Sequence, residues 1–100
     1  MNAMPTVKAW VIDVDGRVVG MGGLAFSRGR WIAFCDLTDE GRHYKRAIVK
    51  AGRAVMQEAG RAGHQFIYAE ADPDEPMADR WLRRNGFRPD QSTRIYRWQA

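Results

Sequence analysis

The chain has 100 residues, of which 45% are hydrophobic and 11% aromatic, and a formal net charge of +4. This length and composition fit one small globular domain with its own core and argue against an unfolded chain. No apolar run reaches the roughly 18 residues of a membrane-spanning helix, and a single cysteine, Cys35, cannot form an intramolecular disulfide. Because the first residues also lack the pattern of a signal peptide, we expect a cytoplasmic protein with no membrane contact.

Three strands are predicted in the first part of the chain. Their segments are rich in β-branched and aromatic residues, which favour strands: VKAWVIDV (7–14), RVVGMGGLAF (17–26) and WIAFCDL (31–37). Asp15 and Gly16 separate the first two and favour a tight hairpin turn, because both central residues of that turn need positive φ. The three strands should therefore form an antiparallel meander. Glycines inside the second strand predict a bulge or a close backbone approach: Gly20, Gly22 and Gly23.

The hydrophobic period changes after residue 38. Apolar side chains recur at intervals of four and three residues, the spacing of one helix face: Tyr44, Ile48, Ala51, Val55 and Ala59. We therefore predict a long helix over about 39–61, which also carries a basic stripe of Arg42, Arg46, Lys50 and Arg53. The remaining predicted elements are a strand at QFIYAEA (65–71), a short helix at DEPMADRWLRRN (74–85) with Pro76 in its first turn, and a strand at STRIYRWQ (92–99).

Together these elements predict one α/β domain over residues 1–100, with two helices and a five-stranded mixed sheet in the order βββαβαβ. The long helix connects the third strand to the fourth, so these two strands should be parallel. We expect this central pair to diverge around residues 37 and 70. The predicted core consists of Trp10, Ile12, Val19, Phe34, Leu37, Ile48, Val55, Phe66, Tyr68, Trp81 and Phe87.

Basic and acidic residues are separated along the chain. Residues 41–61 and 80–100 are strongly basic, whereas AEADPDEPMAD (69–79) holds five acids and no base. Such asymmetry favours an anionic ligand on the basic side or a polar contact with a partner. The alternative is that these charges belong only to solvated helix faces.

The segment LTDEGRHYKRA, residues 37–47, lies where a predicted strand ends and the long helix begins. In α/β sheets this is the place where anions bind, at the positive end of the helix. The segment resembles the pyrophosphate motif Gln/Arg-x-x-Gly-x-Gly/Ala of the GNAT superfamily of acyl-CoA N-acyltransferases. Arg42 and Ala47 match its first and last positions, and Lys45 stands at its central glycine.

A second segment, MADRWLRRNGF (77–87), resembles the family pattern Ala-x-x-Phe-Tyr-x-x-x-Gly-Phe. The positions that correspond are Ala78, Trp81, Gly86 and Phe87. Leu82 stands at the tyrosine that many relatives use as a general acid. The two motifs occur in the order and spacing of the family, and together the resemblance covers most of the chain.

The resemblance implies an N-acetyltransferase that transfers an acetyl group from acetyl-CoA, its co-substrate, to an amine acceptor. The residues that it implies for CoA binding are Leu37, Thr38, Arg42, His43, Tyr44, Lys45, Arg46 and Ala47. For catalysis, a base must take the proton of the amine. Asp36, at a strand end, and Glu70, on the neighbouring parallel strand, are the candidate bases, and Tyr68 is the candidate substitute for the missing acid.

Full-length members of the family usually begin with a strand and two helices, for which residues 1–100 have no counterpart. We therefore expect a shortened GNAT-like domain whose uncovered sheet surface is buried in a homodimer. Shortened members of this kind occur among phage-encoded proteins. The alternative function is accordingly a catalytically inactive GNAT-fold protein that serves in binding or assembly.

Three further site types were considered. A nucleic acid partner is not expected, because no known nucleic-acid motif is present and the aromatic residues alternate as core residues do. No metal site is expected, because the chain holds no cluster of metal ligands. Cys35 alternates with Trp31, Ala33 and Leu37, which predicts a reduced core residue rather than a nucleophile.

Overall fold

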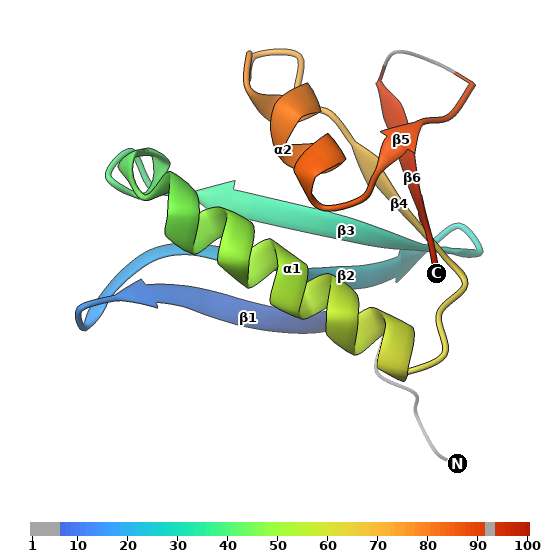
Figure 1. The fold of residues 1–100 in the computed structure, drawn as a ribbon, viewed down its shortest axis with the longest axis horizontal. Coiled ribbons are helices and arrows are strands. Elements are labelled where there is room, and N and C mark those ends of the chain that lie inside the picture. Colours follow the sequence, from blue (N-terminus) through green and yellow to red (C-terminus); the bar gives the residue numbers. More distant parts are fainter. Residues whose placement is uncertain (1–6, 92–93) are drawn as a thin grey trace.

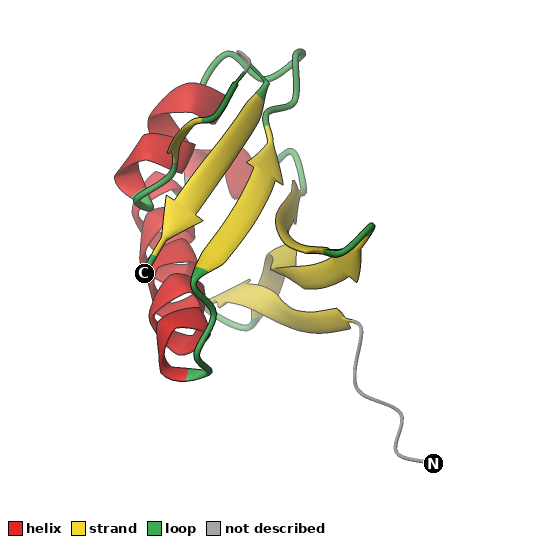
Figure 2. Cartoon of the chain, turned by 90° about the vertical axis from the view of Figure 1, so that its right-hand side faces the viewer, coloured by secondary structure: helices red, strands yellow, loops and turns green. Residues whose placement is uncertain are grey.

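The computed structural model describes residues 7–91 and 94–100. The elements in chain order are β1 (Val7–Val14), β2 (Arg17–Ser27), β3 (Arg30–Leu37), a 3₁₀ helix η1 (Gly41–His43), α1 (Lys45–Arg61), β4 (Phe66–Glu70), α2 (Ala78–Arg84), β5 (Arg88–Pro89) and β6 (Ile95–Gln99). The strands form one mixed sheet in the order β1-β2-β3-β4-β6-β5 (Figure 1). Both helices lie on the same side of this sheet (Figure 2).

The predicted α/β architecture is confirmed, with one difference in the strand count. The sheet has six strands instead of five, because Arg88 and Pro89 pair with Arg97 and Tyr96 as the short strand β5. Two residues are too few to show a strand period, so this edge strand leaves no signal in the sequence. Residues 92 and 93 of the predicted last strand lie outside the described residues.

The β1–β2 hairpin turns as its sequence predicts. Asp15 and Gly16 both have positive φ, at 53° and 81°, and the backbone N–H of Gly16 donates to the Asp13 carboxylate at 2.9 Å. The register shifts between Ile12, which pairs with Gly20, and Asp13, which pairs with Val18. The extra residue, Val19, therefore belongs to the glycine-containing strand β2, where a bulge was predicted. A close approach does occur at Gly23, where an added Cβ would lie 2.0 Å from a carbonyl oxygen of β1.

The parallel pair is the centre of the sheet. Ile32 of β3 pairs with Tyr68 of β4, and the two strands diverge toward their carboxyl ends, as expected (Figure 1). All other strand pairs are antiparallel. The divergence separates the sheet into two halves that share the α1 crossover.

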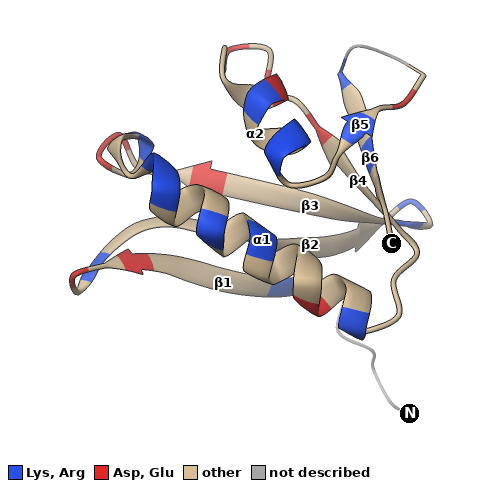
Figure 3. Ribbon diagram, in the orientation of Figure 1, with Lys and Arg blue, Asp and Glu red and all other residues tan. Residues whose placement is uncertain are grey.

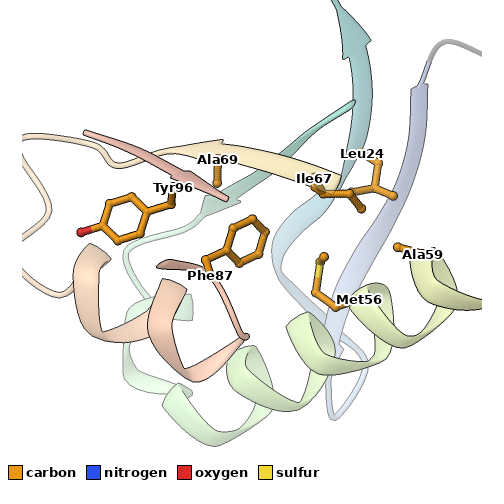
Figure 4. Close-up of a cluster of buried hydrophobic side chains, with 7 residues drawn as sticks. All are labelled: Leu24, Met56, Ala59, Ile67, Ala69, Phe87 and Tyr96. Atoms are coloured by element: carbon orange, nitrogen blue, oxygen red, sulfur yellow. The ribbon is translucent and has the colours of Figure 1, made fainter. Parts of the chain in front are cut away.

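The core lies between the sheet and the helices. Its buried cluster consists of Leu24, Met56, Ala59, Ile67, Ala69, Phe87 and Tyr96 (Figure 4). Of the predicted core residues, Val19, Ile48 and Phe87 are buried. Trp10 and Phe66 are exposed, so the prediction was wrong for both. The other predicted members are half-buried: Ile12, Phe34, Leu37, Val55, Tyr68 and Trp81.

Both helices begin later than predicted. The long helix starts at Lys45 rather than near 39, because residues 41–43 form a 3₁₀ turn first. The short helix starts at Ala78, so Pro76 lies before its first turn. Gly86 follows it with φ at 91°, the left-handed conformation in which glycine commonly ends a helix. Within the described ranges, the structure contains no helix long and apolar enough to span a lipid bilayer.

Candidate functional site

A cavity of about 810 Å³ lies between α1, α2 and the helix-facing side of the sheet. Its walls are mostly apolar, with Ile48 and Val55 from α1 and Trp81 and Leu82 from α2. Charged residues at the carboxyl ends of β3 and β4, and in the loops that follow them, also line it: Asp36, Arg42, Glu70, Asp72 and Glu75. A volume of this size, with apolar walls and a few polar groups, is typical of small-molecule sites.

The turn between β3 and α1 is fixed to strand β2. The backbone N–H and the hydroxyl of Thr38 both donate to the Val19 carbonyl, at 3.0 and 3.1 Å. The N–H of Gly41 donates to the Thr38 hydroxyl at 2.9 Å. A Cβ at position 41 would lie 2.0 Å from the Val19 oxygen, so only glycine allows this approach. The Thr38 hydroxyl therefore holds the turn in place, whatever its role toward CoA.

The amides of this turn divide into two groups. The N–H groups of Arg42, His43 and Tyr44 donate to carbonyls of the turn itself. The first hydrogen bond of α1 runs from the Ile48 N–H to the Tyr44 carbonyl, so the amides of residues 45–47 precede the first helical donor. No acceptor among the described residues takes the N–H groups of Lys45, Arg46 or Ala47. These three donors point out of the positive end of α1 and are available to an anion.

Arg42 is already paired. Its guanidinium forms an ion pair with the carboxylate of Glu75, in the loop between β4 and α2. The Glu75 side chain is only 13% exposed, and its other oxygen accepts the Met77 N–H at 3.2 Å. The pair therefore connects the loops that follow β3 and β4, where these strands diverge. Sequence reasoning missed Glu75; its only signal was the acidic segment that faces a basic turn.

The other predicted CoA-binding residues lie around the start of α1. Leu37 contributes to the cavity wall, His43 is exposed, and Ala47 is half-buried. The Tyr44 hydroxyl lies 3.5 Å from the Glu40 carboxylate. Lys45 and Arg46 line a second, basic groove on the outer side of α1. Their roles in binding CoA stay predictions.

The structure brings two of the three predicted catalytic residues to the cavity. Asp36 and Glu70 both contribute to its wall, and the Glu70 carboxylate lies 3.4 Å from the Arg94 guanidinium. Tyr68 does not belong to this wall in the described part of the chain. Its ring lies under the Arg30 guanidinium, 4.4 Å from the ring centre, a cation–π contact on the sheet face away from the helices.

Comparison with known proteins identifies the fold. No protein-family model and no curated protein matches the chain. Solved structures do, among them an acetyltransferase from Agrobacterium tumefaciens strain C58, with a TM-score of 0.71, and a GNAT-family acetyltransferase from Staphylococcus aureus Mu50, with a TM-score of 0.69. The chain has the GNAT fold. Each of these structures is 18% identical to it over 94% of its residues, and the chain spans 61% and 68% of their respective lengths.

In this GNAT fold, Leu82 and Cys35 both line the cavity. Leu82 also packs against the buried cluster, so the position of the family's tyrosine acid is an apolar wall here. Cys35 is exposed rather than a core residue, which corrects the prediction. The thiol is still partly buried against the cavity wall, and this burial, followed by the Asp36 charge beside it, raises the pKa of Cys35, so it stays protonated at neutral pH.

No group of His, Cys, Asp and Glu side chains among residues 7–91 and 94–100 is arranged to hold a metal ion. The charged residues that line the cavity are five acids, with Arg42 and Lys8 as the cations: Asp36, Glu58, Glu70, Asp72 and Glu75. Carboxylates suit proton transfer, and free amides at a helix start suit a phosphate.

Proposed function

We propose that this chain binds acetyl-CoA and transfers its acetyl group to an amine. One observation carries the proposal: the cavity between the helices and the sheet reaches the carboxyl ends of β3 and β4 and adjoins the start of α1, where three backbone amides have no acceptor among the described residues. Solved structures of the same fold are acetyltransferases. The fit to CoA is chemical, because the ligand combines an anionic diphosphate with a long, largely apolar arm.

The diphosphate would bind at the start of α1. The N–H groups of Lys45, Arg46 and Ala47 can donate to its oxygens, and the helix dipole favours negative charge there. Lys45 replaces the glycine of the family motif, and its side chain is exposed on the first helical turn. Its ammonium can pair with a phosphate as a point charge. The apolar arm would then occupy the cavity beside Leu37.

Asp36 is the better-placed base for the transfer step. Its carboxylate forms no ion pair within the described ranges, whereas Glu70 pairs with Arg94. Asp36 would accept the proton of the attacking amine, directly or through water, as the new C–N bond forms and the C–S bond breaks. The CoA thiolate would take its proton from water, because Leu82 cannot donate one. A missing general acid costs about 100- to 10,000-fold in rate, so we expect slow transfer.

Calorimetry with CoA and acetyl-CoA tests the binding step, and Lys45→Gly is the informative variant. We expect this variant to weaken CoA binding about fivefold or more, because one charge-assisted contact is lost. Arg61→Gly is the matched control, since it also replaces a basic residue of α1 by glycine, but at the far end of the helix and outside the basic groove. Tighter binding by Lys45→Gly would show that lysine crowds the diphosphate instead.

Two results decide the wider proposal. Absence of CoA binding at millimolar ligand would overturn it. Binding of acetyl-CoA without release of thiol in the presence of varied amines would show a GNAT-fold binding protein and not an enzyme.

A further inference from the structure

A groove of about 640 Å³ runs along the outer side of α1, separate from the apolar cavity. Its charged lining consists of cations alone: Lys45, Arg46, Lys50, Arg53 and Arg84. None of these five side chains forms an ion pair or a side-chain hydrogen bond within residues 7–91 and 94–100. Figure 3 shows the basic residues along α1 and on the neighbouring α2. Five unpaired cations around one groove attract a multiply charged anion.

The groove owes its second wall to a helix crossing. An added Cβ at Gly52 of α1 would lie 2.6 Å from the side-chain oxygen of Asn85, the residue that follows α2. Because glycine allows this close approach, the last residue of α2, Arg84, reaches the groove beside Arg53. The cations therefore come from two elements that the fold holds together, and not from one solvated helix face.

The groove begins where the diphosphate is proposed to bind. Lys45 and Arg46 belong to the first turn of α1, and they line the groove as well. Lys50 and Arg53 follow on the same helix, about 7 and 12 Å from Lys45 along its axis. A ligand whose diphosphate lies on the first turn can thus extend a further anionic group toward Lys50 and Arg53.

We infer that this groove binds the third phosphate of the acyl donor, the monoester on the ribose of CoA. This inference rests on the proposed function and names the part of the donor that the outer side of α1 selects. A phosphate monoester is close to doubly charged at neutral pH, so it is the group that gains most from unpaired guanidinium and ammonium groups. The chain would then discriminate CoA from the otherwise identical donor that lacks this phosphate.

The test compares CoA with dephospho-CoA by calorimetry at low and moderate salt. We expect CoA to bind about tenfold more tightly than dephospho-CoA, and this preference should become smaller as added salt screens the charges. The double variant Lys50→Ala, Arg53→Ala should remove most of that preference while dephospho-CoA binding stays unchanged. Arg61→Ala, which removes a cation from the same helix outside the groove, should leave the preference intact.

The outcomes separate this inference from the proposed function. If neither compound binds, the function itself fails. If both bind equally tightly to the natural chain, the function stands and the groove inference is overturned. A preference for CoA that survives in the double variant would also overturn it, because the phosphate would then lie elsewhere.

Discussion

The Tyr96 hydroxyl shows how one polar contact completes the core. Tyr96 is only 4% exposed, and its hydroxyl donates to the Asp79 carboxylate of α2 at 2.5 Å. Arg83 donates to the same carboxylate at 3.0 Å. Hydrogen bonds from Tyr96 and then Arg83 lower the pKa of Asp79, and the bond to Asp79 raises the pKa of Tyr96. A buried phenol thus has the partner that its burial requires.

Replacing this hydroxyl should make stability depend on pH in a defined way. Tyr96→Phe should lower the melting temperature by about 4 °C at neutral pH. The folded pKa of Asp79 is lowered, so its contribution is complete above the ordinary value of 3.8 and is lost as pH falls through the folded pKa. The folded pKa of Tyr96 is raised, so its contribution is complete below 10.0 and is lost as pH rises through the folded pKa.

Thermal melts followed by circular dichroism across this range provide the measurement. The difference in melting temperature between the natural chain and Tyr96→Phe should be largest between pH 3.8 and pH 10.0 and should shrink at lower and at higher pH. Tyr44→Phe is the matched control, because its hydroxyl lies 3.5 Å from a carboxylate on the same segment. An equal loss at every pH would show that Tyr96 contributes packing and not this hydrogen bond.

At the scale of elements, Gly52 sets how closely α1 and α2 cross. In an open helix, Gly→Ala stabilises by about 0.5–1 kcal/mol. Here the added Cβ would lie 2.6–3.0 Å from the Asn85 side chain and displace it from its hydrogen bond to the Trp81 carbonyl at 2.9 Å. An unsatisfied buried amide costs about 1–3 kcal/mol. We therefore expect Gly52→Ala to destabilise the chain by about 1 kcal/mol net.

Gly60→Ala offers the matched comparison on the same helix. Its Cβ would meet Trp98 at 3.8 Å, an ordinary contact, so this variant should be stabilised by about 0.5 kcal/mol. Urea unfolding of both variants gives the two values. Equal stabilisation by the two substitutions would show that the crossing has room for a methyl group.

Local signals explain which elements the sequence could predict. The hairpin turn at Asp15 and Gly16 and the helical period of α1 depend on neighbouring residues, and both were predicted correctly. Strand β4 was predicted, but its faces were exchanged: Ile67 and Ala69 are buried, whereas Phe66 is 41% exposed. The segment FIYAE is apolar on both faces, so its orientation is decided by contact with α1 rather than by its own pattern.

The site was predictable only where it is local. The strand–turn–helix segment around residues 37–47 was found from its position and its resemblance to a phosphate motif. The Arg42–Glu75 pair joins residues 33 positions apart, and the basic groove depends on the Gly52 crossing. Neither has a spacing that a linear pattern can detect, because both arise from packing between elements.

At the scale of the whole molecule, the sheet is two halves joined at its centre. One half is β1-β2-β3 and the other is β4-β6-β5, and the parallel pair at Ile32 and Tyr68 connects them. Beyond this point the strands diverge (Figure 1). The Arg42–Glu75 ion pair spans the diverging ends. The sheet face away from the helices keeps exposed apolar side chains, including Val11 at 64%, and the homodimer expected to cover it stays a prediction.

Removing Arg42 and removing the charge of Glu75 should have opposite effects on the affinity for CoA. Arg42→Ala should weaken CoA binding by about 1–2 kcal/mol if the guanidinium turns to the diphosphate. Glu75→Gln keeps an acceptor for the Met77 N–H but removes the charge that holds Arg42, so we expect this variant to bind CoA about three times more tightly than the natural chain.

In the double variant the gain from Glu75→Gln should vanish, because no guanidinium is left to release. Calorimetry of the two single variants and the double variant measures this coupling. Glu40→Gln is the control, because it removes a carboxylate charge from a different ion pair, the one with Arg17. A Glu75→Gln gain that persists without Arg42 would show that Glu75 repels the ligand directly.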